Sequence, residues 1–118
     1  SLMVIKKDGR REPFDRKKVL SGVIKACEKR PISMEKMEDI VIQIERAIQK
    51  KSDREVSCSR IGELVMEKLK VLDDVAYVRF ASVYRQFKDV GQFMVELKDI
   101  LNKEKRPPQR VGGRPPKH

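Results

Sequence analysis

Apolar residues recur at every third or fourth position over most of the chain, and this spacing is typical of helices that bury one face. Four such stripes each begin after a residue that can cap a helix: Asp15, Ser33, Ser57 or Ser59, and Asp73. The pattern predicts helices over roughly 16–29 and 34–50, a third from Ser57 or Ser59 to about Leu72, and a fourth from Asp73. The segment KKSDRE, residues 50–55, is predicted to be a polar loop.

The later stripes are less regular. On the fourth helix we expect five residues to face inward: Val75, Val78, Phe80, Ala81 and Tyr84. A fifth stripe either extends this helix or forms a separate one that packs on the core or binds a partner; it comprises Phe93, Leu97, Ile100 and Leu101.

The N-terminal stretch VIKKDGRREPF, residues 4–14, predicts a β-hairpin. Asp8-Gly9 suits the two central positions of a type I′ turn. A two-residue loop would pair Lys7 with Arg10, Lys6 with Arg11, Ile5 with Glu12, and Met3 with Phe14. Pro13 cannot donate a ladder hydrogen bond, so its strand should be an edge strand. The fold class expected is therefore α+β and mostly helical, with an N-terminal β-hairpin followed by four to five helices.

The charge balance points to a polyanionic partner, since the net charge is +10. Residues 102–118 carry six Lys or Arg against one Glu, together with four Pro and two Gly. Such a segment buries too little apolar surface to offset the entropy of ordering. We expect one folded domain over residues 1–101 and a disordered basic tail over residues 102–118.

Several classes of function are disfavoured by residue content. With two separate cysteines and a single histidine, His118, the chain cannot build a zinc finger or a Ser-His-Asp triad. Neither a Walker A sequence nor a GxGxxG motif occurs. We therefore expect no enzyme activity. The cysteines are expected to be reduced thiols in a cytoplasmic protein, and no apolar run is long enough for a membrane span.

The basic residues of the hairpin admit two interpretations. Like charges paired across a ladder are unfavourable, although a solvated hairpin tip tolerates them. Alternatively, Lys6, Lys7, Arg10 and Arg11 clamp a phosphate, since both side-chain types suit phosphate oxygens. Lys17 and Lys18 follow in the first turn of the first helix, whose positive N-terminus would add to the same anion site.

Two segments together resemble a known family. VIKKDGRREPFDRKKV and VAYVRFASVYRQFKDV are similar to the ATP-cone domain of the NrdR family of bacterial ribonucleotide-reductase repressors, over about residues 2–93. The resemblance implies a fold in which an N-terminal β-hairpin cap is packed on a bundle of four to five helices. It implies an allosteric domain that binds ATP or dATP, together with Mg²⁺, and does not hydrolyse it. It also implies a bacterial cytoplasmic homo-oligomer whose assembly and binding to double-stranded operator DNA follow the nucleotide state.

The resemblance also assigns nucleotide-binding residues. On the strands these are Val4, Lys6, Lys7, Glu12 and Phe14, with Glu12 and Phe14 near the base and ribose. Lys18 falls on a helix lysine that reaches phosphate, and the remaining assignments are Cys58, Ile61, Tyr84 and Lys88. The family carries an N-terminal zinc ribbon with four cysteines that contacts DNA. This chain lacks it, so zinc and most of the DNA contact are expected only in that ribbon.

Two other functions remain open from the sequence. The hairpin and tail could form a basic nucleic-acid-binding module without nucleotide sensing. The chain could also be an allosteric ATP-cone detached from a ribonucleotide reductase, because reductase cones share the hairpin cap.

Overall fold

The computed structural model describes residues 2–51, 54–85, 94–95, 97–100 and 102. The chain divides into two units, residues 1–86 and residues 87–118. All strands and the four long helices belong to the first unit. In the second unit the described residues, Leu97 and Ile100 of the fifth stripe among them, are helical. Phe93, Leu101 and residues 103–118 of the predicted tail lie outside the described residues.

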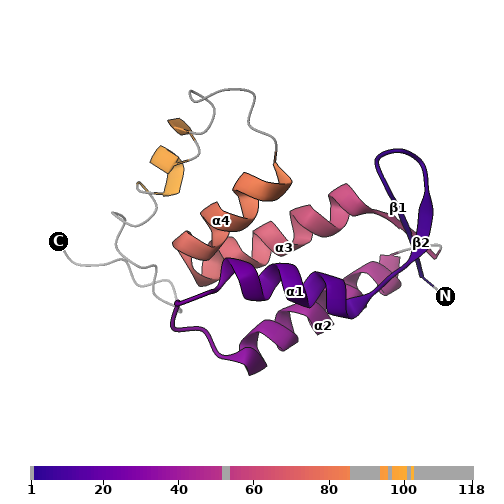
Figure 1. The fold of residues 1–118 in the computed structure, drawn as a ribbon, viewed down its shortest axis with the longest axis horizontal. Coiled ribbons are helices and arrows are strands. Elements are labelled where there is room, and N and C mark those ends of the chain that lie inside the picture. Colours follow the sequence, from indigo (N-terminus) through magenta and orange to yellow (C-terminus); the bar gives the residue numbers. More distant parts are fainter. Residues whose placement is uncertain (1, 52–53, 86–93, 96, 101, 103–118) are drawn as a thin grey trace, which may run out of the picture. The chain divides into compact units, whose positions relative to one another are not determined.

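The first unit is a helical bundle with a small sheet at one end (Figure 1). The strands are β1 (Met3–Ile5), β2 (Arg11–Pro13) and β3 (Glu55–Ser57), in the order β2-β1-β3. β1 and β2 form the predicted antiparallel hairpin, and β2 is the edge strand that Pro13 indicated. β3 pairs with β1 in parallel and was not predicted; it begins at Glu55, the last residue of the predicted polar loop, while α2 extends to Lys51, its second. Three residues are too few to show strand alternation in a sequence.

The hairpin register differs from the prediction by one residue. Met3 lies opposite Pro13, Val4 opposite Glu12, and Ile5 opposite Arg11. The Lys6 N–H donates to the carbonyl of Arg10 at 2.8 Å, so these two residues are paired and the loop between them spans three residues, 7–9; within it, the Gly9 N–H donates to the carbonyl of Lys6 at 2.9 Å. Gly9 has a φ of +90°, whereas Asp8 is not among the residues of positive φ. A type I′ turn requires positive φ at both central positions, and the predicted turn was therefore wrong.

The four helices are α1 (Arg16–Ala26), α2 (Met34–Lys51), α3 (Cys58–Leu72) and α4 (Asp74–Tyr84). The predicted caps are confirmed: Asp15, Ser33, Ser57 and Asp73 each accept a backbone N–H two or three residues ahead. Of the two serines considered for α3, Ser57 is the cap. α1 ends three residues earlier than expected, and Lys29 just beyond it has a φ of 60°. That left-handed conformation cannot continue a right-handed helix.

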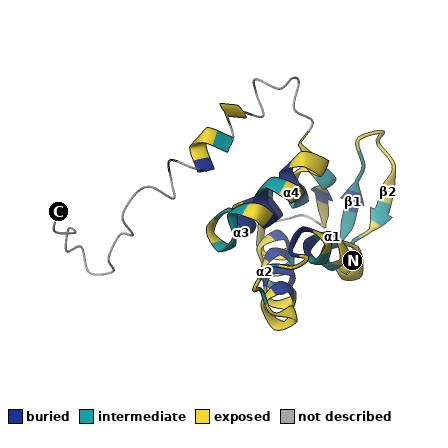
Figure 2. Cartoon of the chain, turned by 60° about the vertical axis from the view of Figure 1, so that its left-hand side comes forward, coloured by how far each residue is buried: buried dark blue, intermediate teal, exposed yellow. Residues whose placement is uncertain are grey.

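The inner faces of the four helices form an aliphatic core (Figure 2). Val23, Ile44 and Leu69 have no solvent exposure. On α4, Phe80 and Ala81 are buried as predicted, together with Ala76 and Tyr77. Val75 and Tyr84 were expected to face inward, but 36% and 49% of their surfaces are exposed. Val75 occupies the exposed first turn of α4, and Tyr84 occupies its last.

An ion pair ties the two helical hairpins together at the end of the bundle away from the sheet. Arg30 Nε lies 3.0 Å from both carboxylate oxygens of Asp73, and the Asp73 side chain is 8% exposed. Asp73 Oδ1 also accepts the Ala76 N–H at 2.9 Å, which caps α4. Burial raises the pKa of Asp73, but the Ala76 N–H and the Arg30 guanidinium outweigh it and hold this pKa below its ordinary value.

We expect Asp73→Ala to lower the free energy of unfolding by about 1–3 kcal/mol, because it removes a helix cap and leaves Arg30 without its partner. Asp74→Ala changes the next residue, which does not cap the helix, and should lower the free energy of unfolding by less. Since the folded-state pKa of Asp73 is lowered, its contribution is present above the unfolded pKa near 3.8 and disappears as the pH falls through the folded value. Urea unfolding from pH 3 to 7 measures both effects; equal losses for both variants at pH 7 would contradict them.

Candidate functional site

Two adjoining hollows lie between the hairpin and the helices. The first has a volume of about 120 Å³ and is lined by β1, β2, α1, α3 and α4. The second, about 440 Å³, lies between the hairpin tip, α3 and the end of α4. Lys6, Cys58, Gly62 and Tyr84 line both, so the two form one continuous depression, which we call the hairpin cleft.

The observed register decides which hairpin residues face this cleft. Opposite residues on paired strands point to the same side, and so do residues two apart on one strand. Val4 lies opposite Glu12, so both face the cleft, and Lys6 shares that face with them. The predicted register would have placed Glu12 opposite Ile5, on the other face of the sheet. The one-residue correction therefore brings Glu12 beside Lys6.

Three charged side chains meet at the mouth of the first hollow. Glu12 Oε1 lies 3.3 Å from Lys18 Nζ and 3.6 Å from Lys6 Nζ. The hydrogen bond from Lys18 is the main reason that the pKa of Glu12 lies below its ordinary value. One carboxylate thus holds two ammonium groups close together, and the trio keeps a net charge of +1. This arrangement can accept a further anion at the lysines.

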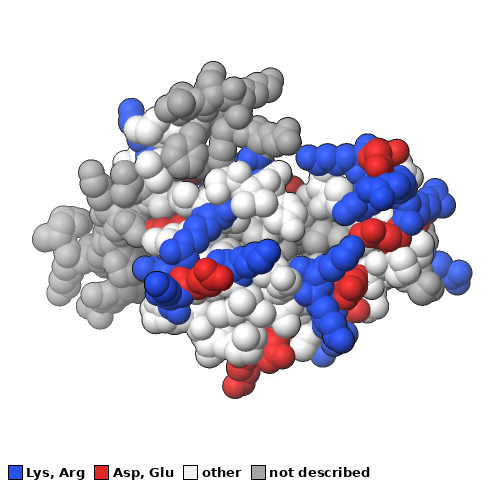
Figure 3. All heavy atoms as spheres, in the orientation of Figure 1, with Lys and Arg blue, Asp and Glu red and all other residues white. Residues whose placement is uncertain are grey.

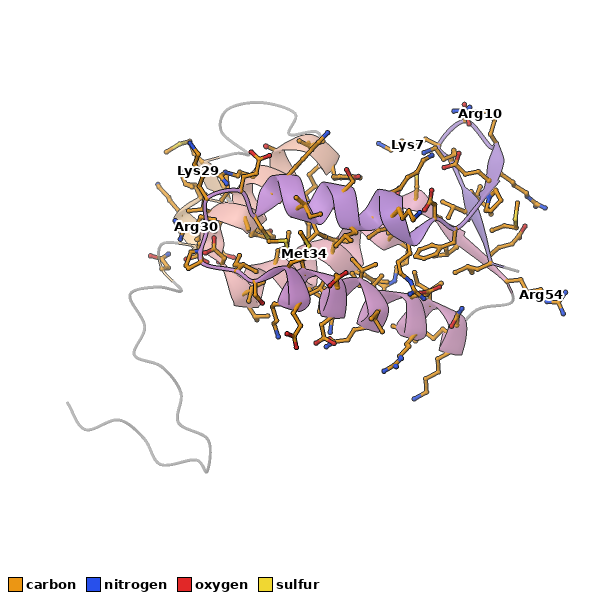
Figure 4. The ribbon with its side chains drawn as sticks, turned by 60° about the horizontal axis from the view of Figure 1, so that its bottom comes forward. Lys7, Arg10, Lys29, Arg30, Met34 and Arg54 are labelled. Carbon is orange, nitrogen blue, oxygen red and sulfur yellow. The ribbon has the colours of Figure 1, made fainter. Side chains whose placement is uncertain are left out.

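The hairpin tip carries more charge, but part of it is neutralised (Figures 3 and 4). The Arg10 backbone N–H donates to Asp8 Oδ1 at 3.0 Å, and Arg10 Nε lies 2.6 Å from Asp8 Oδ2. The backbone hydrogen bond first, and then the guanidinium, hold the pKa of Asp8 below its ordinary value. Arg11 Nη1 lies 2.9 Å from Glu55 Oε2 on β3. Lys7 is exposed and lines the second hollow. Arg10 also lines the second hollow, but Asp8 neutralises its charge, so Lys6, Lys7 and Lys18 carry most of the positive charge at the cleft.

The helical wall of the cleft is apolar and contains an exposed aromatic ring. Tyr84 stacks on Phe80 with ring centroids 4.2 Å apart and planes at 10°. Glycines on two other helices leave room for it: a Cβ on Gly62 would lie 3.5 Å from Tyr84 Cδ1, and one on Gly22 would lie 3.6 Å from its hydroxyl oxygen. A Cβ at these distances makes ordinary van der Waals contact, so only a side chain larger than that of alanine would enter the space of the tyrosine ring.

The structure gathers most of the sequence-predicted site residues around the hairpin cleft. Eight line the first hollow: Val4, Lys6, Glu12, Phe14, Lys18, Cys58, Ile61 and Tyr84. Lys7 lines the second hollow, and Lys88 lies outside the described residues. Their role in binding stays a prediction. Sequence reasoning missed several apolar or small lining residues, namely Val19, Gly62, Val65 and Phe80. Gly62 gave a signal, because a glycine within a helical stripe often marks close packing.

No group of three or more His, Cys, Asp or Glu side chains that could hold a metal ion occurs among the described residues. Cys27 and Cys58 are free thiols, and burial raises the pKa of Cys27. None of the described helices is both long enough and apolar enough to span a membrane.

Comparison with known proteins shows a clear relationship. Residues 2–90 match the ATP cone domain family. A protein of Pelotomaculum thermopropionicum named transcriptional repressor NrdR is 59% identical over 105 residues, which are 89% of this chain and 63% of that protein. Proteins of the same name from Syntrophotalea carbinolica and Acetivibrio thermocellus are 60% and 58% identical. They match 84% and 87% of this chain and 63% and 68% of their own lengths. The chain thus spans about 63% of the first two relatives.

The charged trio predicts a graded effect on the ionisation of Glu12. Lys18→Ala should raise the Glu12 pKa more than Lys6→Ala does, because Lys18 is the closer ammonium and the main cause of the depression. Lys17→Ala removes a charge from the same helical turn without touching Glu12 and should change it least. NMR titration of the Glu12 carboxyl carbon measures all three; a larger effect from Lys17 than from Lys18 would contradict this geometry.

Proposed function

The chain belongs to the ATP-cone family, and on that premise we propose that it is an adenine-nucleotide-sensing regulatory domain of a transcriptional repressor of ribonucleotide reductase genes. The names of its relatives describe regulators of transcription rather than enzymes. They favour a repressor over a cone detached from a reductase. A repressor of this kind works in the bacterial cytoplasm, where the operator DNA is.

The observation that carries the proposal is that an apolar hollow lies directly beside two lysines that could bind an anion. A nucleotide has a flat apolar base at one end and a polyanionic phosphate chain at the other. The first hollow offers the walls of Phe14, Ile61 and Tyr84 to the base. The ammonium groups of Lys6 and Lys18 stand beside it, held at one carboxylate. We propose that these lysines bind the phosphates.

The remaining predicted residues receive roles by position. Glu12 accepts hydrogen bonds from the nucleoside as well as holding the two lysines in place. Lys7 at the second hollow adds positive charge toward the phosphates, and the resemblance to the family gives Lys88 the same role. Mg²⁺ would accompany the triphosphate and balance part of its charge. Zinc would be held only by a separate N-terminal ribbon.

A nucleotide in the hairpin cleft would bridge elements that are distant in the sequence. Its phosphates contact the hairpin and α1, while its base contacts α3 and the end of α4. Such a ligand favours the arrangement in which these elements lie closest together. If that arrangement also differs in how copies of the protein associate, nucleotide binding shifts the oligomer and, through it, the affinity for operator DNA.

We expect Lys6→Ala and Lys18→Ala each to weaken binding of ATP and dATP by about 10- to 100-fold, since each removes a charge-assisted hydrogen bond to phosphate. Lys25→Ala, at the opposite end of α1, is the matched control and should bind as the wild type does. Isothermal titration calorimetry measures the affinities, and thermal melting verifies that all three variants fold. Wild-type affinity in both cleft variants would refute the site.

The regulatory half of the proposal has its own test. The mass of the full chain, measured by light scattering, should differ among samples without nucleotide, with ATP and with dATP. The reason is that the two nucleotides stabilise different assemblies. If calorimetry shows binding but all three masses agree, the sensor proposal fails for this chain while the binding site stands.

A further inference from the structure

The side of α2 opposite its buried face carries a line of mostly charged residues. Glu35, Asp39, Arg46 and Lys50 are exposed and Ile42 is half-buried between them. Spacings of four, three, four and four residues place all five on one face of the helix. We call them the outer stripe of α2. In Figure 4 the side chains of α2 project along the lower edge, away from the hairpin.

The charges of the outer stripe are segregated by sign. The two acids occupy the N-terminal half of α2, and the two bases occupy the C-terminal half. Favourable interaction with the helix dipole accounts for Glu35 in the first turn and Lys50 in the last. That effect fades beyond the terminal turns, so it does not account for Asp39 and Arg46.

These charges are also available for a partner. In the part of the chain that the structure describes, Glu35, Arg46 and Lys50 form no ion pair, and Asp39 accepts only the side-chain amide of Gln43, at 3.0 Å. Glu45, on the neighbouring side of the same helix, is by contrast held by Arg16 Nη2 at 2.6 Å. The outer stripe therefore differs from the side of α2 that faces α1.

We propose that the outer stripe is a self-association surface on which α2 of a second copy docks in antiparallel orientation. A two-fold axis between Ile42 and Gln43 places Glu35 opposite Lys50 of the second copy, and Asp39 opposite Arg46 of the second copy. The axis generates each pair twice, giving four complementary pairs. Ile42, the apolar member of the stripe, lies at the centre, where the two helices are closest.

The surface fits a weak and salt-sensitive dimer. α2 has 18 residues and is about 27 Å long, so two crossed copies bury less area than a stable interface requires. Exposed ion pairs contribute little individually and are screened by salt. The stripe lies apart from the hairpin cleft and includes none of its lining residues. This association accordingly does not depend on nucleotide binding.

Charge reversal on the full chain tests the proposal. The first variant is Glu35→Lys with Asp39→Lys, and the second is Arg46→Glu with Lys50→Glu. Each gives a stripe of one sign, so two identical copies repel each other. Mixed together, the two variants form four complementary pairs again. Sedimentation equilibrium at 50 mM NaCl without nucleotide should show a dimer for the wild type, at least ~10-fold weaker association for each variant alone, and recovery in the equimolar mixture.

The matched control reverses two exposed charges elsewhere, Lys25→Glu with Glu67→Lys, and should associate as the wild type does. Circular dichroism and ATP binding confirm that each variant folds with an intact cleft. A monomeric wild type, undiminished association of either variant, or failure of the mixture to recover would overturn the proposal. None of these outcomes bears on nucleotide binding, which calorimetry tests separately.

Discussion

The pairing of strand β1 with its two neighbours determines which residues line the hairpin cleft. β1 is the middle strand, paired with β2 along one edge and with β3 along the other, and it carries the buried Val4. Because side chains alternate across a strand, its register with β2 decides whether Glu12 meets Lys6 or faces away from the cleft. Its pairing with β3 brings the start of α3, including Cys58, to the same place.

Local chemistry made the helices predictable, whereas pairing between distant segments was not. Asp15, Ser33 and Asp73 cap helices through atoms two or three residues away, so their signal lies within a few letters of sequence. β3 exists only because residues 55–57 meet β1, fifty residues earlier, and nothing local marks it. The hairpin itself was predicted, but an Asp-Gly pair is compatible with two loop lengths, and the longer one forms.

In the candidate site, too, some features could be predicted from local sequence, whereas others depend on contacts between distant segments. Residues with charged side chains, such as Lys6, Glu12 and Lys18, were predicted as site residues from the sequence and its resemblance to a family. The shape of the cleft was not, because it depends on Gly22 and Gly62 making room for Tyr84 and on Phe80 supporting that ring. Side chains without charge acquire a role here only through packing.

The positive charge of the chain serves more than one purpose. On the hairpin, Arg10 and Arg11 are engaged by Asp8 and Glu55, and they stabilise the loop and the sheet. Lys6 and Lys18 share one carboxylate and retain a net positive charge toward the cleft. On α2 the basic residues are balanced by acids at the other end of the same helix, which suits contact with a second copy. We therefore propose that nucleotide binding and self-association use separate surfaces.

The claim that the hairpin cleft is the nucleotide site is tested most directly by amide NMR spectra of the full chain during titration with ATP. If ATP binds there, we expect the largest shift changes on β1 and β2, in the first turns of α1 and α3, and at Tyr84, with little change along the outer stripe of α2. Saturable binding whose shift changes lie elsewhere, with the hairpin resonances unmoved, would contradict it.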